Sequence, residues 1–475
     1  MTTILKPDIC VIGAGSGGLT VAAAAASLGA SVVLIERGKM GGDCLNYGCV
    51  PSKALIASAR QAHRLSHGGS LGIAAVEPSI DFARVAGHIE QAIAAIAPND
   101  SKERFTALGV EVISAQGHFK DPRTVVAGGS EIRARRFVIA TGSSPAIPPI
   151  PGLSDVPFLT NETTFGLKQS PAHLIIVGGG PIGMERAQAH RRLGADVTVL
   201  EADTVLGKED PELALGVKQA LLKEGVAILE HARAERVERY KGTGIRVHVA
   251  DEKGAHSIDG SHLLIATGRR PNVEALALEN AGVAYGPGGI TISPKLRTTN
   301  RRIFAIGDVA GGPQFTHVAN YHAGLVIRAI LFRLPVKANH EHIPRVTFTD
   351  PELAQIGLTE NEARRRGLQV KVLRSSFSEN DRAHAEGHTD GFIKLIVGRR
   401  GRILGVSILG RGAGEMMHFW SLALSRRMRV HDISQYVAPY PTLGEIGKRA
   451  ALSYFAEAAR SSSVRGILGF LRLFG

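Results

Sequence analysis

The segment GGDCLNYGCVPSK, residues 41–53, follows a predicted apolar strand and holds two of the three cysteines in the chain. Five residues of regular helix rise about 7.5 Å, which exceeds the roughly 7 Å limit on the Cα separation of a disulfide. A bridge between Cys44 and Cys49 therefore needs a distorted turn, which Asn46 and Gly48 tolerate. We interpret the pair as a dithiol that accepts and returns electrons; the alternative is two buried thiols that lie close by coincidence.

Length and composition favour a soluble α/β protein of several domains. The 475 residues are too many for one hydrophobic core and predict two to four domains. The formal charge of +13 suits anionic ligands such as dinucleotides. Because the basic residues are spread along the chain and do not cluster with aromatic residues, no nucleic-acid partner is expected.

Residues 9–35 carry no charge and are long enough to span a bilayer. Glycines interrupt them, so the segment is predicted to form a strand, a glycine turn, an alanine-rich helix and a second strand. The chain also lacks the charged start of a signal peptide, which favours a cytoplasmic location. In that compartment a cysteine pair is more often catalytic than structural. Cys10, inside the first strand, is expected to be a small core residue.

A nucleotide-binding pattern follows the first strand. The strand DICVIG leads into GAGSGG, which places Gly13, Gly15 and Gly18 in GxGxxG spacing before a helix. These glycines permit a tight turn, close approach of the backbone to a pyrophosphate and tight helix packing, while the helix N-terminus favours the anion. The next strand ends at Glu36, 23 residues after Gly13, where a carboxylate accepts hydrogen bonds from ribose hydroxyls.

The same pattern occurs a second time. HLIIVGGGPIG gives Gly178, Gly180 and Gly183, and the strand that follows ends at Glu201, again 23 residues after the first glycine. One GxGxxG alone is a weak signal, because glycine-rich turns open many strand–helix units. Two copies with matching acidic residues predict two dinucleotide sites.

The repeat divides the chain into segments. Residues 1–147 are predicted to form the first nucleotide-binding unit, and a proline-rich linker at 145–152 marks its boundary. Residues 148–271 form the second unit, and residues 272–346 contain IFAIGDVAGG, another strand that ends in glycine and aspartate. Residues 347–475 change to strands such as FIKLIV and ILGVSIL with helices around them, which predicts an α+β domain.

These motifs resemble the pyridine nucleotide-disulfide oxidoreductases, the flavoproteins that include glutathione reductase, dihydrolipoamide dehydrogenase and mercuric reductase. The resemblance runs from about residue 8 to 455 and rests on GAGSGG, GGDCLNYGCVPSK, ATGSSP, GGGPIGME, ATGRRPN, AIGDVAG and APYPTLGE. It implies an α/β fold with two Rossmann-like domains of the glutathione reductase type, one for FAD (1–147 and 272–346) and one for NAD(P) (148–271). It also implies a C-terminal α+β dimerisation domain (347–475) and a homodimer whose active sites are shared across the interface.

The resemblance implies roles for individual residues. Cys49 resembles the flavin-proximal sulfur and Cys44 the sulfur that exchanges with substrate, while Lys53 resembles the lysine beside flavin N5 and Glu185 its partner. A cation there stabilises reduced flavin, and the carboxylate holds the ammonium in place. The residues implied to bind FAD and NAD(P)H are Gly13, Gly15, Gly18, Glu36, Gly42, Lys53, Gly117, Thr141, Gly142, Ser143, Asp308, His317, Gly178, Gly180, Gly183, Glu185, Glu201 and Gly268.

Charge predicts which nicotinamide coenzyme is used. Glu201 suits a free 2′-hydroxyl and repels a 2′-phosphate. The residues that follow it, Ala202, Asp203 and Thr204, supply no arginine that would neutralise such a phosphate. NADH is therefore predicted over NADPH.

The chain departs from the disulfide reductases of this family near its C-terminus. Those enzymes carry a histidine in HPTxxE, supplied by the partner subunit as acid and base for the exchanging thiol, whereas this chain has PYPTLGE with Tyr440 and Glu445. A phenol with a pKa of about 10 does not replace an imidazole of about 6.5 as a base at neutral pH. The tyrosine resembles mercuric reductase, whose soft-metal substrate needs no such proton transfer; the alternative is a packing residue at the dimer interface.

The expected activity passes electrons from NADH through FAD and the dithiol to a small acceptor, which is a soft metal ion, a quinone or other small oxidant, or an unusual disulfide. No resident metal is expected. The N-terminal metal-binding domain and C-terminal cysteine pair that deliver Hg²⁺ in mercuric reductases have no counterpart in this sequence. The alternatives are a dihydrolipoamide dehydrogenase-like enzyme that uses Glu445 without a histidine, and a redox sensor or electron-relay subunit with little turnover.

An apolar stripe at helical spacing lies near residue 475: Val464, Ile467, Leu468, Leu471 and Phe474. Arg465 and Arg472 lie elsewhere on the turn. Such a stripe either lies on a membrane surface or packs on its own protein. Packing is favoured, because Gly466 and Gly469 weaken an isolated helix.

Overall fold

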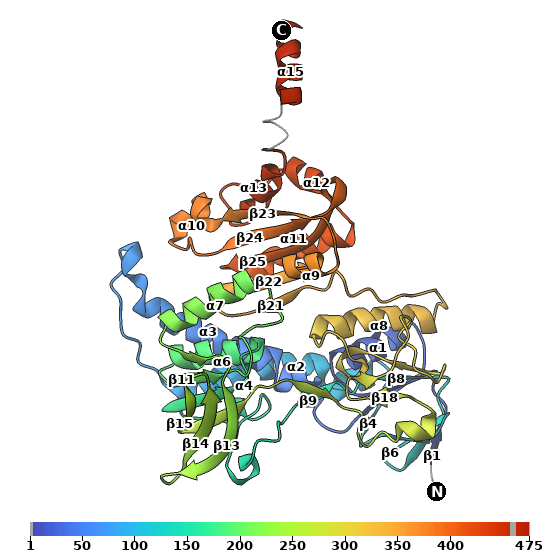
Figure 1. Cartoon of the computed structure of the whole chain (residues 1–475). Helices are drawn as coiled ribbons and strands as arrows, with labels where there is room; N and C mark the ends of the chain where they lie inside the picture. The colour runs from blue at the N-terminus through green and yellow to red at the C-terminus, as the bar shows by residue number, and fades with distance from the viewer. Residues whose placement is uncertain (1–2, 457–461, 475) are drawn as a thin grey trace.

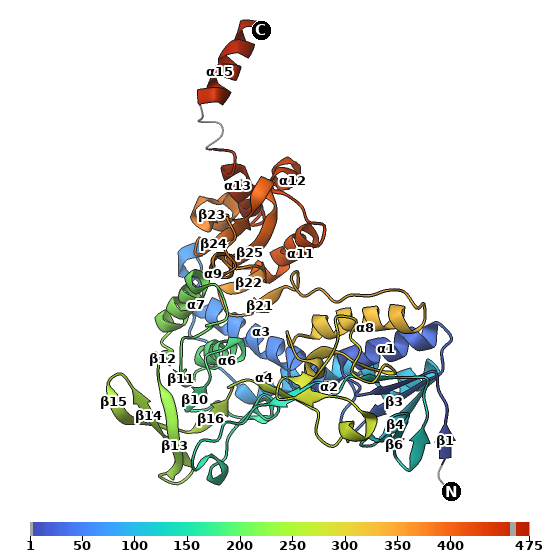
Figure 2. The same ribbon diagram turned by 45° about the vertical axis from the view of Figure 1, so that its right-hand side comes forward.

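The computed structural model describes residues 3–456 and 462–474. Figure 1 shows two lobes side by side, each built on a parallel sheet, and a third lobe above them built on an antiparallel sheet. This arrangement confirms the predicted fold class, two Rossmann-like units followed by an α+β domain. Figure 2 shows the third lobe resting mainly over α3 (Cys49–Ser66), which belongs to the first nucleotide-binding unit, and over α6 (Pro181–Arg192) and α7 (Pro211–Lys223) of the second.

The first sheet has five parallel strands in the order β20-β8-β2-β3-β4. Their bounds are β2 Ile9–Ile12, β3 Val32–Glu36, β4 Val110–Ser114, β8 Arg136–Ile139 and β20 Ile303–Ala305. Helix α1 (Ser16–Ser27) connects β2 to β3 and packs against α8 (Thr316–Ile330). The strand, glycine turn, helix and strand predicted for residues 9–35 are therefore confirmed, and Cys10 is fully buried in β2 as expected.

The second sheet repeats this construction with four parallel strands in the order β12-β11-β10-β16. They are β10 His173–Val177, β11 Asp196–Leu200, β12 Ala227–Leu229 and β16 His262–Ile265. Helix α6 (Pro181–Arg192) follows β10, α7 (Pro211–Lys223) follows β11, and a separate antiparallel sheet is formed by β13 Arg233–Tyr240, β14 Gly244–Asp251 and β15 Gly254–Gly260.

Two short strands connect the lobes. β9 (Ser143–Pro145) pairs antiparallel with β17 (Arg269–Pro271). The carbonyl of Thr141 accepts from the side-chain amide of Asn272 at 2.9 Å, and the hydroxyl of Thr141 donates to the carbonyl of Asn272 at 2.7 Å. The turn predicted to contact FAD and the segment that closes the second unit are therefore held together.

The third sheet is antiparallel, in the order β21-β22-β25-β24-β23. Its strands are β21 Arg345–Thr347, β22 Glu352–Gly357, β23 Lys371–Ser376, β24 Phe392–Val397 and β25 Ile403–Gly410. The helices α11 (Ala413–Ser425) and α13 (Glu445–Ser453) pack on it, and Met417, Trp420 and Ile446 form part of their shared core. The remaining helices of this lobe are α9 Glu360–Arg365, α10 Asp381–Glu386 and α12 Val430–Gln435.

The cysteine segment is broken where the sequence predicts a distorted turn. Helix α2 (Gly42–Asn46) ends at Tyr47, and α3 (Cys49–Ser66) begins after Gly48, whose φ of −119° and ψ of −105° are not helical. A Cβ atom at Gly48 would lie 2.8 Å from the Asp43 carboxylate. The two cysteines thus lie on different helices. Helix α3 then forms a pair with α4 (Phe82–Ile96) and packs on α6.

The packing predicted for the apolar stripe near residue 475 is not seen within one subunit. In Figures 1 and 2, helix α15 (Ser462–Leu471) stands clear of the third lobe. The side chains of Ile467, Leu471 and Phe474 are 59%, 55% and 75% exposed. Helical spacing establishes that one face is apolar, but it does not say what covers that face. None of the described helices is long and apolar enough to cross a membrane.

A buried lysine holds the second lobe to the third. Lys394, on β24, lies 2.9 Å from the Asp210 carboxylate that caps α7, 3.1 Å from Glu212 and 2.9 Å from Glu360. The side chains of Lys394 and Asp210 are only 4% and 1% exposed. Because both charges are out of water, removing one leaves the other without its compensating partner.

We expect Lys394→Met to lower the free energy of unfolding by about 3–5 kcal/mol, the usual cost of leaving a buried charge unpaired. Urea unfolding followed by circular dichroism measures the change. Lys223→Met, at an exposed lysine on α7, is the matched control and should change stability by no more than about 0.5 kcal/mol. Equal effects of the two substitutions would show that the buried cluster does not hold the lobes together.

Candidate functional site

One cavity of about 2480 Å³ lies between the two parallel sheets and below the third. Typical pockets for one small ligand measure roughly 300–1,000 Å³, so this space is large enough for two dinucleotides. Both glycine turns, both cysteines, Lys53 and Glu185 line it, as do most of the other residues predicted to bind a cofactor: Gly13, Gly15, Glu36, Gly42, Thr141, Gly142, Ser143, Asp308, His317, Gly178, Gly180, Glu201 and Gly268. Gly18, Gly117, Gly183, Tyr440 and Glu445 are not in its wall.

The two glycine turns have the same geometry. Gly13 and Gly178 have φ values of +105° and +114°, and a Cβ atom on either would lie 2.4 Å from the carbonyl oxygen of the neighbouring strand end. Gly18 and Gly183 serve helix packing, because a Cβ on either would lie 1.9 Å from the oxygen of Gly13 or Gly178. Helices α1 and α6 begin without a side-chain cap. Their free N–H groups therefore point at the space where an anion would bind.

The acidic residues at the ends of β3 and β11 are also equivalent. The Glu36 carboxylate accepts from the backbone N–H groups of Ala14 at 2.6 Å and Gly38 at 2.7 Å. The Glu201 carboxylate accepts from Gly179 at 2.6 Å and from the N–H of Asp203 at 3.0 Å. Each carboxylate is thus fixed beside its glycine turn with lone pairs left for ribose hydroxyls. Gly117 lies away from the cavity wall, and a Cβ atom added to it would lie 3.2 Å from Ile35 and 3.6 Å from Val125.

Cys44 and Cys49 are free thiols that form a hydrogen bond with each other. That hydrogen bond, the nearby Thr316 hydroxyl and the Lys53 charge lower the pKa of Cys49 from its ordinary value of 9.0 to about 6, against burial and the charge of Asp43. The Thr316 oxygen lies 3.3 Å from the Cys49 sulfur. The hydrogen bond with Cys49, burial and the charge of Cys49 raise the pKa of Cys44. In this reduced state Cys49 is the thiolate at neutral pH and Cys44 keeps its proton.

Lys53 and Glu185 meet as the sequence predicts. The Lys53 ammonium lies 3.0 Å from the Glu185 carboxylate, which is 6% exposed. The same carboxylate accepts from the backbone N–H of Phe348 at 2.9 Å and from the Ser52 hydroxyl at 3.3 Å. The ring of Phe348 lies 4.2 Å from the ammonium. Three segments, one from each lobe, therefore position this cation in the cavity wall.

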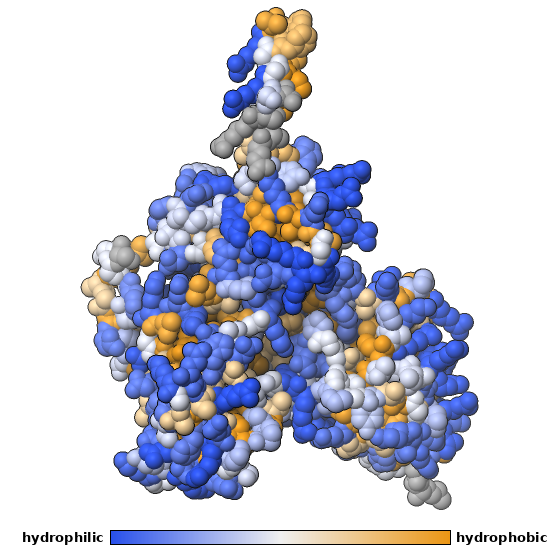
Figure 3. Space-filling view, viewed as in Figure 1, coloured by the Kyte–Doolittle hydropathy of each residue, from blue (hydrophilic) through white to orange (hydrophobic). Residues whose placement is uncertain are grey.

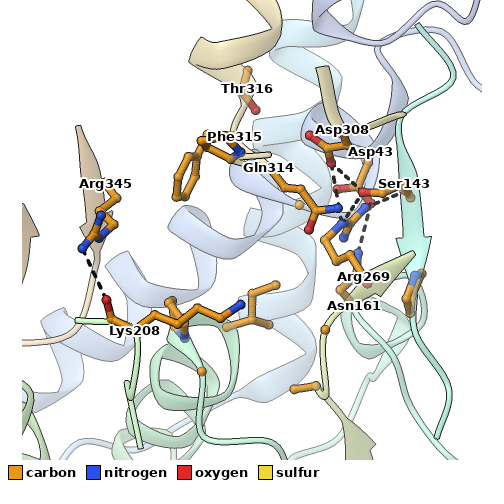
Figure 4. Close-up of a pocket in the computed structure, with 18 of the residues that line it drawn as sticks. Asp43, Ser143, Asn161, Lys208, Arg269, Asp308, Gln314, Phe315, Thr316 and Arg345 are labelled. Carbon is orange, nitrogen blue, oxygen red and sulfur yellow. Dashed lines mark hydrogen bonds and ion pairs between the residues drawn. The ribbon is translucent and has the colours of Figure 1, made fainter. Parts of the chain in front are cut away.

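A network around Arg269 forms the other side of the cavity, as Figure 4 shows. Its Nε donates to the Ser143 hydroxyl at 2.7 Å, and that hydroxyl donates to Asp308 at 2.5 Å. The guanidinium also lies 3.2 Å from Asp43, which accepts from the Asn161 amide at 3.0 Å. Burial raises the pKa of Asp308, while Ser143 and Arg269 oppose that rise.

Sequence reasoning missed Arg269, Asp43, Thr316 and Phe348 as site residues. The first two stand inside quoted motifs, ATGRRPN and GGDC, and a charged residue within a glycine-rich motif is the signal that would have found them. Thr316 and Phe348 carry no such signal. His317 lines the cavity, with its Nε2 2.8 Å from the Pro344 carbonyl and its ring stacked on Phe315. Burial lowers the pKa of His317.

Tyr440 and Glu445 lie in the third lobe, away from the cysteines of their own subunit. Tyr440 is 71% exposed, and its hydroxyl donates to Asp381 at 2.9 Å, which raises the pKa of the phenol. The Glu445 carboxylate accepts from the N–H of Thr442 at 3.1 Å. Across residues 3–456 and 462–474, no group of three or more histidine, cysteine, aspartate or glutamate residues is arranged to hold a metal ion.

Two dinucleotide-type turns that share one cavity, with a thiol pair and a lysine–glutamate pair between them, define an oxidoreductase that uses two nucleotide cofactors and a dithiol. Residues 7–323 match the family model for pyridine nucleotide-disulphide oxidoreductases, and residues 343–451 match the dimerisation domain of the same family. The chain belongs to the pyridine nucleotide-disulphide oxidoreductase family.

Several curated relatives cover nearly the whole chain. The mercuric reductase of Streptomyces lividans is 35% identical over 468 residues, which cover 97% of this chain and 98% of that protein. The mercuric reductase of Bacillus cereus is 36% identical over 97% of this chain and 73% of that protein. The dihydrolipoyl dehydrogenase of Geobacillus stearothermophilus is 35% identical over 94% of this chain and 96% of that protein.

Solved structures show the same fold. The Cu(II) complex of the HOCl-induced flavoprotein disulfide reductase RclA from Escherichia coli is 29% identical, with a TM-score of 0.83 over 93% of this chain and 98% of that chain. LpdA from Mycobacterium tuberculosis is 27% identical, with a TM-score of 0.86 over 95% of this chain and 99% of that chain. The family uses FAD and NAD(P)H, and both glycine turns, with their uncapped helices and fixed carboxylates, fit such dinucleotides.

We expect the Cys49 thiolate to persist well below pH 8 and to be lost as the pH falls through about 6, because its pKa lies there. The long-wavelength absorbance between the thiolate and flavin, measured in the two-electron-reduced enzyme from pH 8 to pH 5, reports this titration. Cys44→Ala removes the hydrogen bond that lowers the pKa most. Because this variant has no disulfide to reduce, its Cys49 is titrated with the flavin oxidised, and the midpoint should move upward. Cys10→Ala, in β2, is the control and should leave it unchanged. A wild-type midpoint near 9 would contradict the assignment.

Proposed function

We propose that the protein carries electrons from NADH, through FAD, to the Cys44–Cys49 pair and on to a small acceptor, as a mercuric reductase-like enzyme. One observation carries the proposal: the thiol pair and the Lys53–Glu185 pair are complete, while Tyr440 stands where the disulfide reductases have a histidine. The identity of about 35% to mercuric reductases supports the same acceptor chemistry.

The protein's own residues prepare this chemistry. Bound FAD supplies a group that accepts hydride and passes electrons in pairs. Glu185 holds the Lys53 ammonium in the cavity wall, where a cation favours negative charge on a bound ring system. Cys49 supplies a thiolate at neutral pH, and Cys44 supplies the second sulfur with its proton. In this proposal Cys49 faces the flavin and Cys44 meets the acceptor.

Thiolates are ligands that soft metal ions prefer. An ion bound by the two sulfurs accepts electrons without a histidine to shuttle protons. The similar RclA was solved as a Cu(II) complex, which supports a metal ion as one class of acceptor. A quinone or other small oxidant is a further class of acceptor that needs no histidine base. The dihydrolipoyl dehydrogenase relative at 35% identity favours a second candidate, oxidation or reduction of a small disulfide with Glu445 as the polar group.

The proposed assembly is a homodimer with residues 1–147 and 272–346 binding FAD, 148–271 binding NADH and 347–475 forming the interface. The match to the family's dimerisation domain supports it. Exposed apolar side chains in this lobe also support it: Phe419 37%, Leu422 61%, Val437 91% and Leu452 50%. In such a dimer, Tyr440 of one subunit would approach the cysteines of the other.

Glu201 supports NADH as the coenzyme. Its carboxylate lines the cavity and is fixed by two backbone N–H groups, so it does not move aside for a phosphate. Arg233 and Lys208 also line the cavity. The preference for NADH therefore requires that Glu201 repels a 2′-phosphate more strongly than Arg233 and Lys208 attract it.

We expect kcat/KM to be roughly a hundredfold higher with NADH than with NADPH, the size of a penalty of a few kcal/mol for a phosphate beside a carboxylate. Glu201→Gln removes the repulsion between the carboxylate and the 2′-phosphate. It should lower the ratio of kcat/KM with NADH to kcat/KM with NADPH at least tenfold. Glu36→Gln, at the equivalent position of the first turn, should leave the ratio unchanged, because it faces the other cofactor. Equal or better kcat/KM with NADPH in the wild type would refute the preference.

The acceptor is tested with Hg²⁺, a soluble quinone, lipoamide and glutathione disulfide. We expect turnover of the metal ion or quinone and poor turnover of both disulfides, because the phenol is a weak base at neutral pH. Tyr440→His should raise disulfide turnover by about 10² or more, as general acid–base catalysis does. Tyr440→Phe should lower turnover of a metal acceptor without changing flavin reduction by NADH.

The matched control for Tyr440→Phe is Tyr285→Phe, which also removes an exposed phenol that donates to a carboxylate, Glu279, but far from the third lobe. It should leave every acceptor activity unchanged. Wild-type turnover of lipoamide at the rates of histidine-bearing enzymes would show that Tyr440 does not determine the substrate. Reduction that stops after one turnover with every acceptor would instead identify a redox sensor.

A further inference from the structure

Helix α15 and the short turn η9 (Arg472–Phe474) form a separate apolar surface. Both views show α15 standing away from the three lobes. Six large apolar side chains in this segment are substantially exposed: Ile467 59%, Leu468 47%, Phe470 59%, Leu471 55%, Leu473 78% and Phe474 75%. No comparable run of exposed apolar residues occurs elsewhere in residues 3–456.

A helix of this kind needs a surface to stabilise it. Helix α15 has ten residues, and isolated helices shorter than about 12–15 residues are marginal in water. Gly466 and Gly469 lower its intrinsic stability further. Burial of the apolar side chains against something else is therefore required to maintain the helix.

The charges of the segment indicate what that surface is. Arg465 and Arg472 are the only ionisable side chains in residues 462–474. They are seven residues apart, which is two helical turns, and thus lie on the same side. Figure 3 shows hydrophilic atoms along one side of this segment and hydrophobic atoms along the other. The chain as a whole carries a formal charge of +13.

A second copy of the segment is a poor partner, because it supplies no anionic side chain for Arg465 and Arg472. The surface of an anionic lipid bilayer can bury the apolar side chains among its acyl chains. It also offers negative headgroups to the arginines.

We propose that residues 462–474 dock this protein on the surface of an anionic lipid bilayer. The helix is about 15 Å long, half the roughly 30 Å of a hydrocarbon core, so it lies in the plane of the interface. Its apolar side chains enter the boundary between headgroups and acyl chains, and Arg465 and Arg472 contact lipid phosphates. The thiols, the Lys53–Glu185 pair and both glycine turns lie outside residues 462–474, so we expect docking to leave the redox chemistry unchanged.

Flotation of the full-length FAD-loaded protein with vesicles tests the proposal. One set contains only phosphatidylcholine, and the other contains about 30% phosphatidylglycerol. We expect at least tenfold stronger binding to the anionic vesicles, weakened by raising NaCl from 0.05 to 0.5 M. Each basic residue near an anionic surface contributes roughly a fivefold factor, so Arg465→Gln with Arg472→Gln should reduce binding about 25-fold.

Ile467→Ser with Leu471→Ser should abolish binding to both kinds of vesicle. Val76→Ser with Leu215→Ser, which changes two apolar side chains that are 57% and 52% exposed in the other lobes, is the matched control and should bind like the wild type. All variants should oxidise NADH at the wild-type rate, which shows that the fold and redox site are intact and separates this inference from the proposed function.

Wild-type protein that stays with neither vesicle would overturn the proposal, as would equal binding by the Ile467→Ser and Leu471→Ser variant. If that variant instead changes the mass measured by analytical ultracentrifugation, the segment contacts a second copy of the chain and the lipid proposal is wrong.

Discussion

The arrangement of the site depends on the ion pair between Lys53 and Glu185, which joins the helix that begins at Cys49 to the helix that follows the second glycine turn. Helix α3 begins at Cys49, so Lys53 lies one turn into the helix that carries this thiol. Helix α6 begins at the second glycine turn, so Glu185 lies one turn beyond the second nucleotide site. The ion pair, with 3.0 Å between the ammonium and the carboxylate, therefore holds the thiols and both glycine turns in one arrangement. Because Phe348 donates to the same carboxylate, the start of the third lobe is held there as well.

The charged residues around the thiols act in opposite directions on the Cys49 thiolate. Asp43, four residues after Lys39 and directly before Cys44, raises the pKa of Cys49, which acts against the thiolate. Arg269, from the segment that closes the second unit, lies 3.2 Å from Asp43 and offsets that negative charge. The carboxylate next to the dithiol thus has its ion-pair partner more than two hundred positions away in the sequence. The β9–β17 pairing that brings Arg269 there also connects the two lobes, so the fold and the thiol chemistry share one contact.

Sequence motifs predicted those parts of the site whose residues lie close together in the chain. The glycine turns, Glu36 and Glu201 are read directly from spacing, because a strand, a turn and a helix fix where the next strand ends. Thr316 and Phe348 could not be predicted, because they reach the cysteines and the lysine only through tertiary packing. Gly117 was assigned by resemblance alone, and its neighbours are core side chains rather than the cavity. The apolar stripe predicted the helix, but periodicity carries no information about what lies opposite, and the stripe is exposed within one subunit.

The raised pKa of Cys44 connects the substrate question to Tyr440. A disulfide acceptor requires Cys44 to lose its proton before attack and a leaving thiolate to gain one, and both steps need a group that titrates near neutral pH. The phenol of Tyr440 has a pKa raised by the Asp381 carboxylate to which it donates, so it is further from that role than an ordinary tyrosine. A soft metal ion needs no such base, because metal binding itself displaces the thiol proton. Cys44 and Tyr440, both with raised pKa values, are therefore compatible with a soft metal ion as acceptor and poorly suited to a disulfide.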